Sequence, residues 1–83
     1  SSPMANYLVT GGCGFIGSHL VDHLVEQGEG VRVLDDLSTG RRSNLAESER
    51  LIEFVQGDIR DSEVIARAVE DMDYVLHQAA IPS

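Results

Sequence analysis

Hydrophobic residues along the chain alternate between a spacing typical of buried strands and one typical of amphipathic helices. Short apolar runs closed by turn residues predict four strands: Tyr7–Thr10, Val31–Leu34, Ile52–Val55 and Tyr74–His77. From Phe15 to Gln27, apolar residues recur every three or four positions, which predicts a helix ended by Gly28 in a left-handed cap. A short, weak helix is expected within Ser43–Arg50, and another after Asp61 or Ser62, either of which can cap it.

This alternation of strands and helices with short connections predicts parallel strands joined by right-handed crossovers. We therefore expect an α/β fold, a partial Rossmann (doubly wound) sheet of about four strands in the order 3-2-1-4 with three helices. Two helices would cover one face of the sheet and one helix the other. The fourth strand would then lie at an open edge, which indicates a piece of a larger enzyme and offers a surface for self-association. Ser1–Pro3, ahead of Met4, are interpreted as a remnant of cloning.

The charge and composition of the chain exclude several classes of binding partner and of functional site. The 83 residues include six Arg, no Lys and fourteen Asp and Glu, giving a net charge of −8. No basic stripe is available for a nucleic-acid backbone, and no apolar run approaches the ~20 residues of a membrane span. The absence of Lys removes Schiff-base chemistry and a P-loop lysine. One Cys excludes an internal disulfide and a multi-cysteine zinc site, and it fits a reducing, cytoplasmic setting.

A glycine-rich segment lies between the first predicted strand and the first predicted helix; it reads Gly11-Gly12-Cys13-Gly14-Phe15-Ile16-Gly17. In a dinucleotide-binding turn, Gly11 would permit the tight turn, Gly14 would let a pyrophosphate approach backbone N–H groups, and Gly17 would let the helix pack closely. The helix N-terminus would face the phosphates with unpaired N–H groups. Three glycines alone are equally typical of an ordinary turn, and it is the flanking strand, helix and acid that favour the dinucleotide site.

That acid is Asp35, which ends the second predicted strand eighteen residues after Gly17, near the spacing of roughly 20 expected for a ribose-binding carboxylate. Such a carboxylate accepts hydrogen bonds from the ribose 2′- and 3′-hydroxyls and repels a 2′-phosphate, so it favours NAD over NADP. Arg41 and Arg42 keep NADP as the alternative, because either could pair with a 2′-phosphate. Asp36 is interpreted equally well as a turn acid or as a ligand contact.

Further candidates follow the third and fourth predicted strands, at the carboxyl edge where ligands bind in such folds. Asp58 could accept from the adenine amino group with Ile59 against the ring, although in isolation a turn aspartate after Gly57 is the first interpretation. Ala79 and Ala80 would either let the cofactor approach or pack the strands tightly.

The histidines and the cysteine are interpreted as structural. His77 is expected to be packed or hydrogen-bonded. His19 and His23 have a metal-capable spacing but no third ligand, so no metal site is predicted. Cys13 is interpreted as a small loop residue; a place near a helix N-terminus can lower a thiol pKa, but nothing beside Cys13 indicates a nucleophile.

Four segments together resemble the N-terminal part of the extended short-chain dehydrogenase/reductases, the NAD-dependent nucleotide-sugar epimerase/dehydratase family. They are Thr10-Gly11-Gly12-Cys13-Gly14-Phe15-Ile16-Gly17-Ser18-His19-Leu20, Asp35-Asp36-Leu37-Ser38-Thr39-Gly40, Gly57-Asp58-Ile59-Arg60-Asp61 and His77-Gln78-Ala79-Ala80. They occur in the family's order and spacing. Residues 35–40 and 77–83 are most similar to UDP-sugar 4-epimerases, so residues 4–83 are interpreted as the N-terminal part of an NAD-binding domain whose catalytic remainder is absent.

The resemblance implies NAD as cofactor and, for the parent enzyme, a UDP-sugar as substrate. By this resemblance the pyrophosphate would contact Gly14, Phe15 and Ile16, and the adenine would contact Asp58 and Ile59. The adenosine ribose and the neighbouring phosphate would be held by Asp35, Asp36, Ser38, Thr39 and Gly40. The nicotinamide-ribose side of the cofactor would be lined by Gln78 and Ala79. In such an epimerase a tyrosine takes the sugar 4-hydroxyl proton while hydride moves to NAD, and hydride then returns to the other face of the 4-keto sugar.

The family's catalytic Tyr-x-x-x-Lys lies downstream of the segments present here. Tyr7 and Tyr74 are followed four residues later by Gly11 and Gln78, so no catalytic residue is assigned in this chain. Two interpretations stay open. One is the NAD-binding segment of an epimerase, or of a dehydratase, decarboxylase or reductase of the same family. The other is a stand-alone, non-catalytic nucleotide-binding module.

Overall fold

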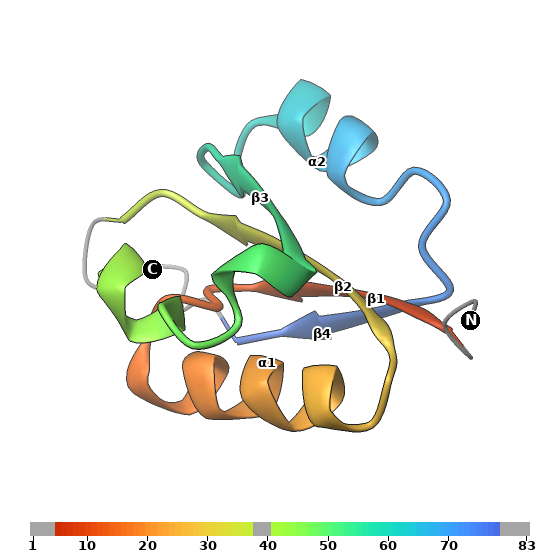
Figure 1. The fold of residues 1–83 in the computed structure, drawn as a ribbon. Helices are drawn as coiled ribbons and strands as arrows, with labels where there is room; N and C mark the ends of the chain where they lie inside the picture. The colour runs from red at the N-terminus through yellow and green to blue at the C-terminus, as the bar shows by residue number, and fades with distance from the viewer. Residues whose placement is uncertain (1–4, 38–40, 79–83) are drawn as a thin grey trace.

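A four-stranded parallel sheet lies at the centre of the molecule in the computed structural model, which describes residues 5–37 and 41–78 (Figure 1). The strands, in the spatial order β3-β2-β1-β4, are β1 (Asn6–Thr10), β2 (Gly30–Asp35), β3 (Ile52–Gln56) and β4 (Tyr74–His77). The helical elements are α1 (Phe15–Glu26), α2 (Ser62–Ala68) and the 3₁₀ helices η1 (Arg42–Leu45) and η2 (Glu49–Leu51). The strand order and the parallel pairing confirm the predicted partial Rossmann sheet.

All four strands end at the same edge of the sheet. Thr10, the last residue of β1, pairs with Leu34 of β2 and with His77 of β4, and Asp35 pairs with Gln56 of β3. The connections that follow the strands therefore leave the sheet side by side. Those predicted binding residues that fall within the described ranges lie at the ends of the strands or in the connections that follow them, at this carboxyl edge.

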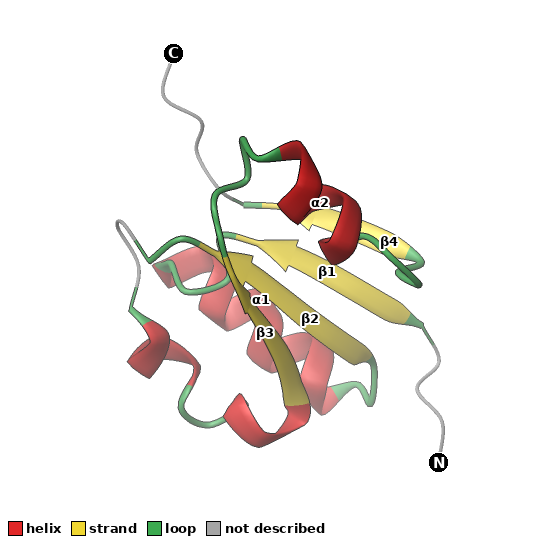
Figure 2. Ribbon diagram, turned by 90° about the horizontal axis from the view of Figure 1, so that it is seen from above, coloured by secondary structure: helices red, strands yellow, loops and turns green. Residues whose placement is uncertain are grey.

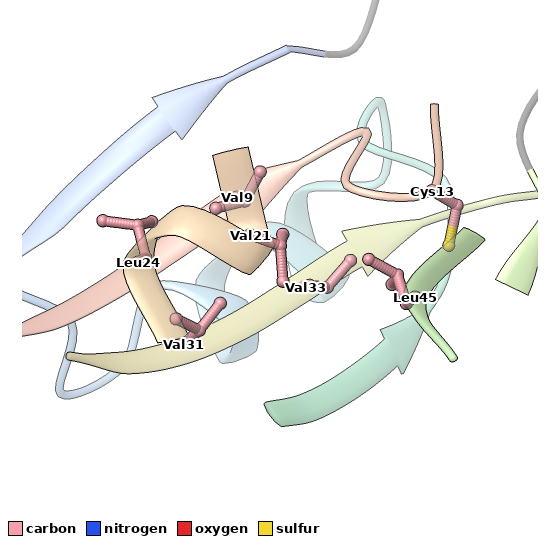
Figure 3. Close-up of a cluster of buried hydrophobic side chains, with 7 residues drawn as sticks. All are labelled: Val9, Cys13, Val21, Leu24, Val31, Val33 and Leu45. Carbon is pink, nitrogen blue, oxygen red and sulfur yellow. The ribbon is translucent and has the colours of Figure 1, made fainter. Parts of the chain in front are cut away.

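Different elements cover the two faces of the sheet, because neighbouring residues of a strand point to opposite sides. α1 and η1 pack on one face and α2 on the other (Figures 1 and 2), which agrees with the expected two-against-one arrangement. The buried cluster on the α1 face consists of Val9, Cys13, Val21, Leu24, Val31, Val33 and Leu45 (Figure 3). The buried cluster on the α2 face consists of Leu8, Leu34 and Ala68.

The expected helix within 43–50 is wrong in type, and the described residues contain two α-helices rather than three. The segment forms 3₁₀ turns, in which the Ala46 N–H bonds to the Ser43 carbonyl at 3.2 Å and the Ser48 N–H bonds to the Leu45 carbonyl at 3.0 Å. Leu45 is fully buried, and the Ser48 hydroxyl donates to Asp22 of α1 at 2.5 Å. These tertiary contacts hold the tighter turns, and serine hydroxyls favour turns over regular helix.

The helix ends agree closely with the sequence. Gly28 adopts a φ of 80°, the left-handed conformation predicted for it, two residues after α1 ends at Glu26. At the start of α2, the Asp61 carboxylate accepts from the Glu63 N–H at 3.0 Å, so Asp61 is the cap and Ser62 is the first helical residue.

Residues 1–4, 38–40 and 79–83 lie outside the described part of the chain, and with them the interpretation of Ser1–Pro3. Within the described ranges, no helix has the length and hydropathy needed to cross a membrane.

Candidate dinucleotide-binding site

The glycine-rich loop turns sharply at Gly11, whose φ of 73° lies in the left-handed region that favours glycine. The Gly11 N–H donates to the Leu34 carbonyl at 2.8 Å, and the Gly14 N–H donates to the Gly11 carbonyl at 3.2 Å. The tight turn predicted for Gly11 is therefore present, directly after β1.

Gly17 lies against the same turn. A Cβ atom at this position would be 2.3 Å from the Gly11 carbonyl oxygen, so the first turn of α1 can approach the loop only because residue 17 has no side chain. The predicted close packing is present, although the partner is the loop backbone. At Gly14 the nearest heavy atom to a Cβ would be 3.4 Å away, which leaves room beside this peptide.

Gly12 has a packing role that the sequence analysis missed. A Cβ atom there would be 2.6 Å from Cγ1 of Val33, a fully buried residue of the α1-face cluster. This role cannot be recognised from the glycine motif alone, because it depends on the strand register that brings Val33 of β2 against the loop.

The N-terminus of α1 is open toward the carboxyl edge. Gly14 precedes the helix in an extended conformation without a side-chain cap, and the first turn contains no acidic residue. The first bond into the helix is that from the Ser18 N–H to the Gly14 carbonyl, at 2.8 Å. In the described part of the chain, nothing accepts from the N–H groups of residues 15–17. Such groups, together with the positive end of the helix dipole, suit an anion such as a pyrophosphate.

The first two side chains of α1 are apolar and exposed. Phe15 is 77% exposed and Ile16 69% exposed. The Phe15 ring contacts the His19 ring edge-on, with 4.8 Å between the centroids. Large apolar side chains beside an open helix terminus offer a surface that a bound ligand could cover.

Asp35 is brought directly against the glycine-rich loop. Asp35 is 6% exposed, and its carboxylate accepts from the Cys13 N–H at 2.9 Å through Oδ2 and from the Leu37 N–H at 2.7 Å through Oδ1. A carboxylate offers about four acceptor positions, so both oxygens keep capacity for ribose hydroxyls. The structure thus joins the predicted phosphate loop and the predicted ribose acid.

Asp58 forms a turn with Arg60 after β3. Its carboxylate accepts from the Arg60 guanidinium at 2.8 and 3.1 Å and from the Arg60 N–H at 2.8 Å. The guanidinium bonds, reinforced by the backbone bond, lower the pKa of Asp58 to about 2. The same pair raises the pKa of Arg60, and the charge of Asp36 contributes in the same direction. Arg60 was not among the predicted site residues, although it is two positions from Asp58.

Ile59 is half-buried and packs against the cluster under α2. Gln78 follows β4 with an exposed side chain, and its N–H donates to the Thr10 carbonyl at 2.9 Å. His77 Nδ1 and Thr10 Oγ1 are 2.7 Å apart, which confirms a hydrogen-bonded histidine.

The nearby helix N-terminus does not lower the pKa of the Cys13 thiol. The side chain is completely buried, and burial raises the pKa to about 11, with the Asp35 charge adding to the rise and Arg42 opposing it. Desolvation therefore outweighs the nearby helix N-terminus. Across residues 5–37 and 41–78, no three His, Cys, Asp or Glu side chains gather where they could hold a metal ion.

Residues 41–44 contact the glycine-rich loop. The Asn44 side-chain amide donates to the Cys13 carbonyl at 2.7 Å, a contact that no sequence signal indicated. The Arg42 guanidinium stacks over Phe54 at 4.5 Å and lies 3.3 Å from Glu49. The roles predicted for Ser38, Thr39, Gly40, Ala79 and Ala80 lie outside the described residues and stay predictions.

Comparisons with known proteins agree on one family. The model of the NAD dependent epimerase/dehydratase family matches residues 7–83. The chain is 49% identical over 76 residues to a UDP-glucose 4-epimerase of Mycolicibacterium smegmatis, covering 88% of this chain and 24% of that protein. It is 47% identical over 76 residues to a dTDP-glucose 4,6-dehydratase of Mycobacterium tuberculosis, covering 88% of this chain and 23% of that protein.

Among solved structures, a Thermus thermophilus UDP-glucose 4-epimerase in complex with NAD superimposes with a TM-score of 0.80 at 45% identity, over 94% of this chain and 25% of that one. The chain thus spans about a quarter of the length of the proteins it matches.

Proposed function

The chain belongs to the NAD dependent epimerase/dehydratase family, and we propose that it is the NAD-binding segment of a UDP-sugar 4-epimerase. One observation carries the NAD-binding part of the proposal: the open N-terminus of α1 and the buried Asp35 carboxylate meet at Cys13, whose N–H is 2.9 Å from Asp35 Oδ2. A donor site for phosphates and an acceptor site for ribose hydroxyls are thereby adjacent, as an adenosine diphosphate group requires. The 49% identity to the UDP-glucose 4-epimerase supports the epimerase part.

Each part of the site has a role in this proposal. The N–H groups of α1 hold the pyrophosphate, the Asp35 carboxylate holds the adenosine ribose, and the turn at Asp58 faces the adenine. Further contacts are proposed for Gly11, Gly14, Phe15, Ile16, Gly17, Asp36, Ile59 and Gln78, and for Ser38, Thr39, Gly40 and Ala79 outside the described residues. NAD, when bound, supplies a hydride acceptor for carbon 4 of the sugar.

Two features support NAD over NADP. The Asp35 carboxylate is in place to repel a 2′-phosphate. Of the two arginines that could favour NADP, Arg42 is engaged by Glu49 and by the Phe54 ring.

A side-by-side titration of the full chain with NAD and ADP-ribose tests the proposal. We expect weak and similar affinities, because the contacts named above serve the adenosine half and the pyrophosphate. NAD binding more than about tenfold tighter than ADP-ribose, or about 1.4 kcal/mol, would contradict this assignment. The chain alone should convert no UDP-galactose to UDP-glucose, whereas the parent enzyme should do so.

A sugar-nucleotide dehydratase is the second candidate for the parent, favoured by the 47% identity to the dTDP-glucose 4,6-dehydratase. Incubating the parent enzyme with UDP-galactose and with dTDP-glucose distinguishes the two. Epimerised UDP-glucose supports the first candidate, and loss of water from dTDP-glucose supports the second.

A further inference from the structure

The Cys13 peptide is held from two sides by parts of the chain that are distant in sequence. Its N–H donates to Asp35 Oδ2 at 2.9 Å, and its carbonyl accepts from the Asn44 amide at 2.7 Å and from the Arg41 N–H at 3.2 Å. Because the peptide unit is planar, fixing the Cys13 carbonyl also supports the direction of the Gly14 N–H, which donates to the Gly11 carbonyl at 3.2 Å and so closes the loop. Gly14 is the residue from which α1 starts.

Only two side chains among the described residues bond to the loop backbone between Gly11 and Gly14: those of Asp35 and Asn44. Asp35 has a ligand role in the proposed function. Asn44 has none, since its side-chain donor is directed to the Cys13 carbonyl.

The Asn44 amide is not needed for its own turn. The turn is closed by backbone bonds, including that from the Asn44 N–H to the Arg41 carbonyl at 2.9 Å, and it is anchored by the fully buried Leu45. Because backbone bonds close the turn, the bond from the Asn44 side chain to the glycine-rich loop is best explained by an effect on that loop.

We propose that Asn44 is a positioning residue that holds the glycine-rich loop in the orientation needed to bind a pyrophosphate. This inference rests on the proposed function. It predicts that loss of the Asn44 donor weakens ligands that carry a pyrophosphate and leaves the affinity for adenosine unchanged, because Cys13 belongs to the loop that holds the pyrophosphate in the proposed function.

The experiment compares Asn44→Leu, which keeps the approximate shape without the donor, with the smaller Asn44→Ala. Ser43→Ala, on the same exposed turn, is the matched control. Titrations of the full chain with ADP-ribose and with adenosine are accompanied by melting temperatures and by amide NMR shifts of Gly14 and Phe15.

We expect ADP-ribose affinity to fall about fivefold to tenfold in both Asn44 variants, adenosine affinity to stay within twofold, and the two amide signals to shift. Ser43→Ala should change none of these. Unchanged ADP-ribose affinity, or equal losses for both ligands together with a lower melting temperature, would overturn the positioning role while leaving the proposed function intact. Failure of the unaltered chain to bind ADP-ribose would instead overturn the proposed function, and this inference with it.

Discussion

On the α1 face of the sheet, seven residues form one buried cluster that runs from β1 and β2 through α1 to η1 (Figure 3). On the α2 face, the buried hydrophobic cluster within the described residues has three members, Leu8, Leu34 and Ala68, and α2 has seven residues against twelve in α1. The glycine-rich loop continues directly into the well-buried face, whereas Asp58 and Ile59 lie at the start of the thinly covered one. We infer that the glycine-rich loop is held more rigidly than the turn at Asp58. We also infer that the α2 face opens first in local unfolding.

The largest expected effect is on the free energy of unfolding, when a large side chain is removed from each face of the sheet in turn. Leu45→Ala removes a fully buried side chain from the α1-face cluster and should lower the free energy of unfolding by about 2–5 kcal/mol. Ile65→Ala on α2 removes a partly buried side chain and should cost roughly 1–2 kcal/mol. Urea denaturation of both variants measures the difference. Equal losses would show that the two faces contribute alike.

Asp35 bonds to the glycine-rich loop on the well-buried face and is the acceptor proposed for the ribose, so its substitution should affect binding strongly. Asp35→Ala removes the acceptor proposed for the ribose hydroxyls, and loss of a hydrogen bond to a charged group is worth on the order of 1.5–3 kcal/mol. Titration calorimetry with NAD measures the loss. Asp35→Asn, which can keep an oxygen toward the Cys13 N–H, is the control for loop position. An unchanged NAD affinity in Asp35→Ala would remove this residue from the proposed site.

Substitutions at Gly12 and Gly14 should separate an effect on the stability of the fold from an effect on ligand affinity. A side chain at Gly12 meets Val33 of the core at 2.6 Å, so Gly12→Ala should destabilise the fold by about 1–3 kcal/mol. A Cβ at Gly14 meets nothing closer than 3.4 Å, so Gly14→Val should fold but occupy the place proposed for the pyrophosphate. We expect Gly14→Val to lose at least tenfold in ADP-ribose affinity, about 1.4 kcal/mol, and to lose more than Gly12→Ala. Circular dichroism checks the fold of each variant first, and equal affinities would argue against this assignment of the loop.

The local features of the site were predictable because they depend on short stretches of sequence. The strand before Gly11, the spacing from Gly17 to Asp35 and the cap at Asp61 are all readable within one or two elements. The contacts of Gly12 with Val33 and of Asn44 with Cys13 join separate elements, so they depend on strand register and on the path of the 41–45 segment. The 3₁₀ turns were missed for the same reason, since the burial of Leu45 and the bond from Ser48 to Asp22 are tertiary contacts.

The smallest expected effect lies at the exposed turn that begins the α2 face. The Arg60 guanidinium and N–H lower the pKa of Asp58 from 3.8 to about 2. Because this pKa is lower in the folded state than in the unfolded state, the ion pair stabilises the fold above about pH 4, and its contribution is lost as the pH falls toward 2.

NMR titration of the Asp58 carboxyl should give a midpoint near 2 in the unaltered chain. In Arg60→Gln the midpoint should return only part of the way to 3.8, because the backbone N–H of residue 60 still donates to Asp58. Arg67→Gln, which changes an arginine on α2 outside this turn, should leave the midpoint unchanged. A midpoint near 3.8 in the unaltered chain would show that the Asp58–Arg60 pair does not persist in solution and that the turn proposed to face the adenine is not held by it.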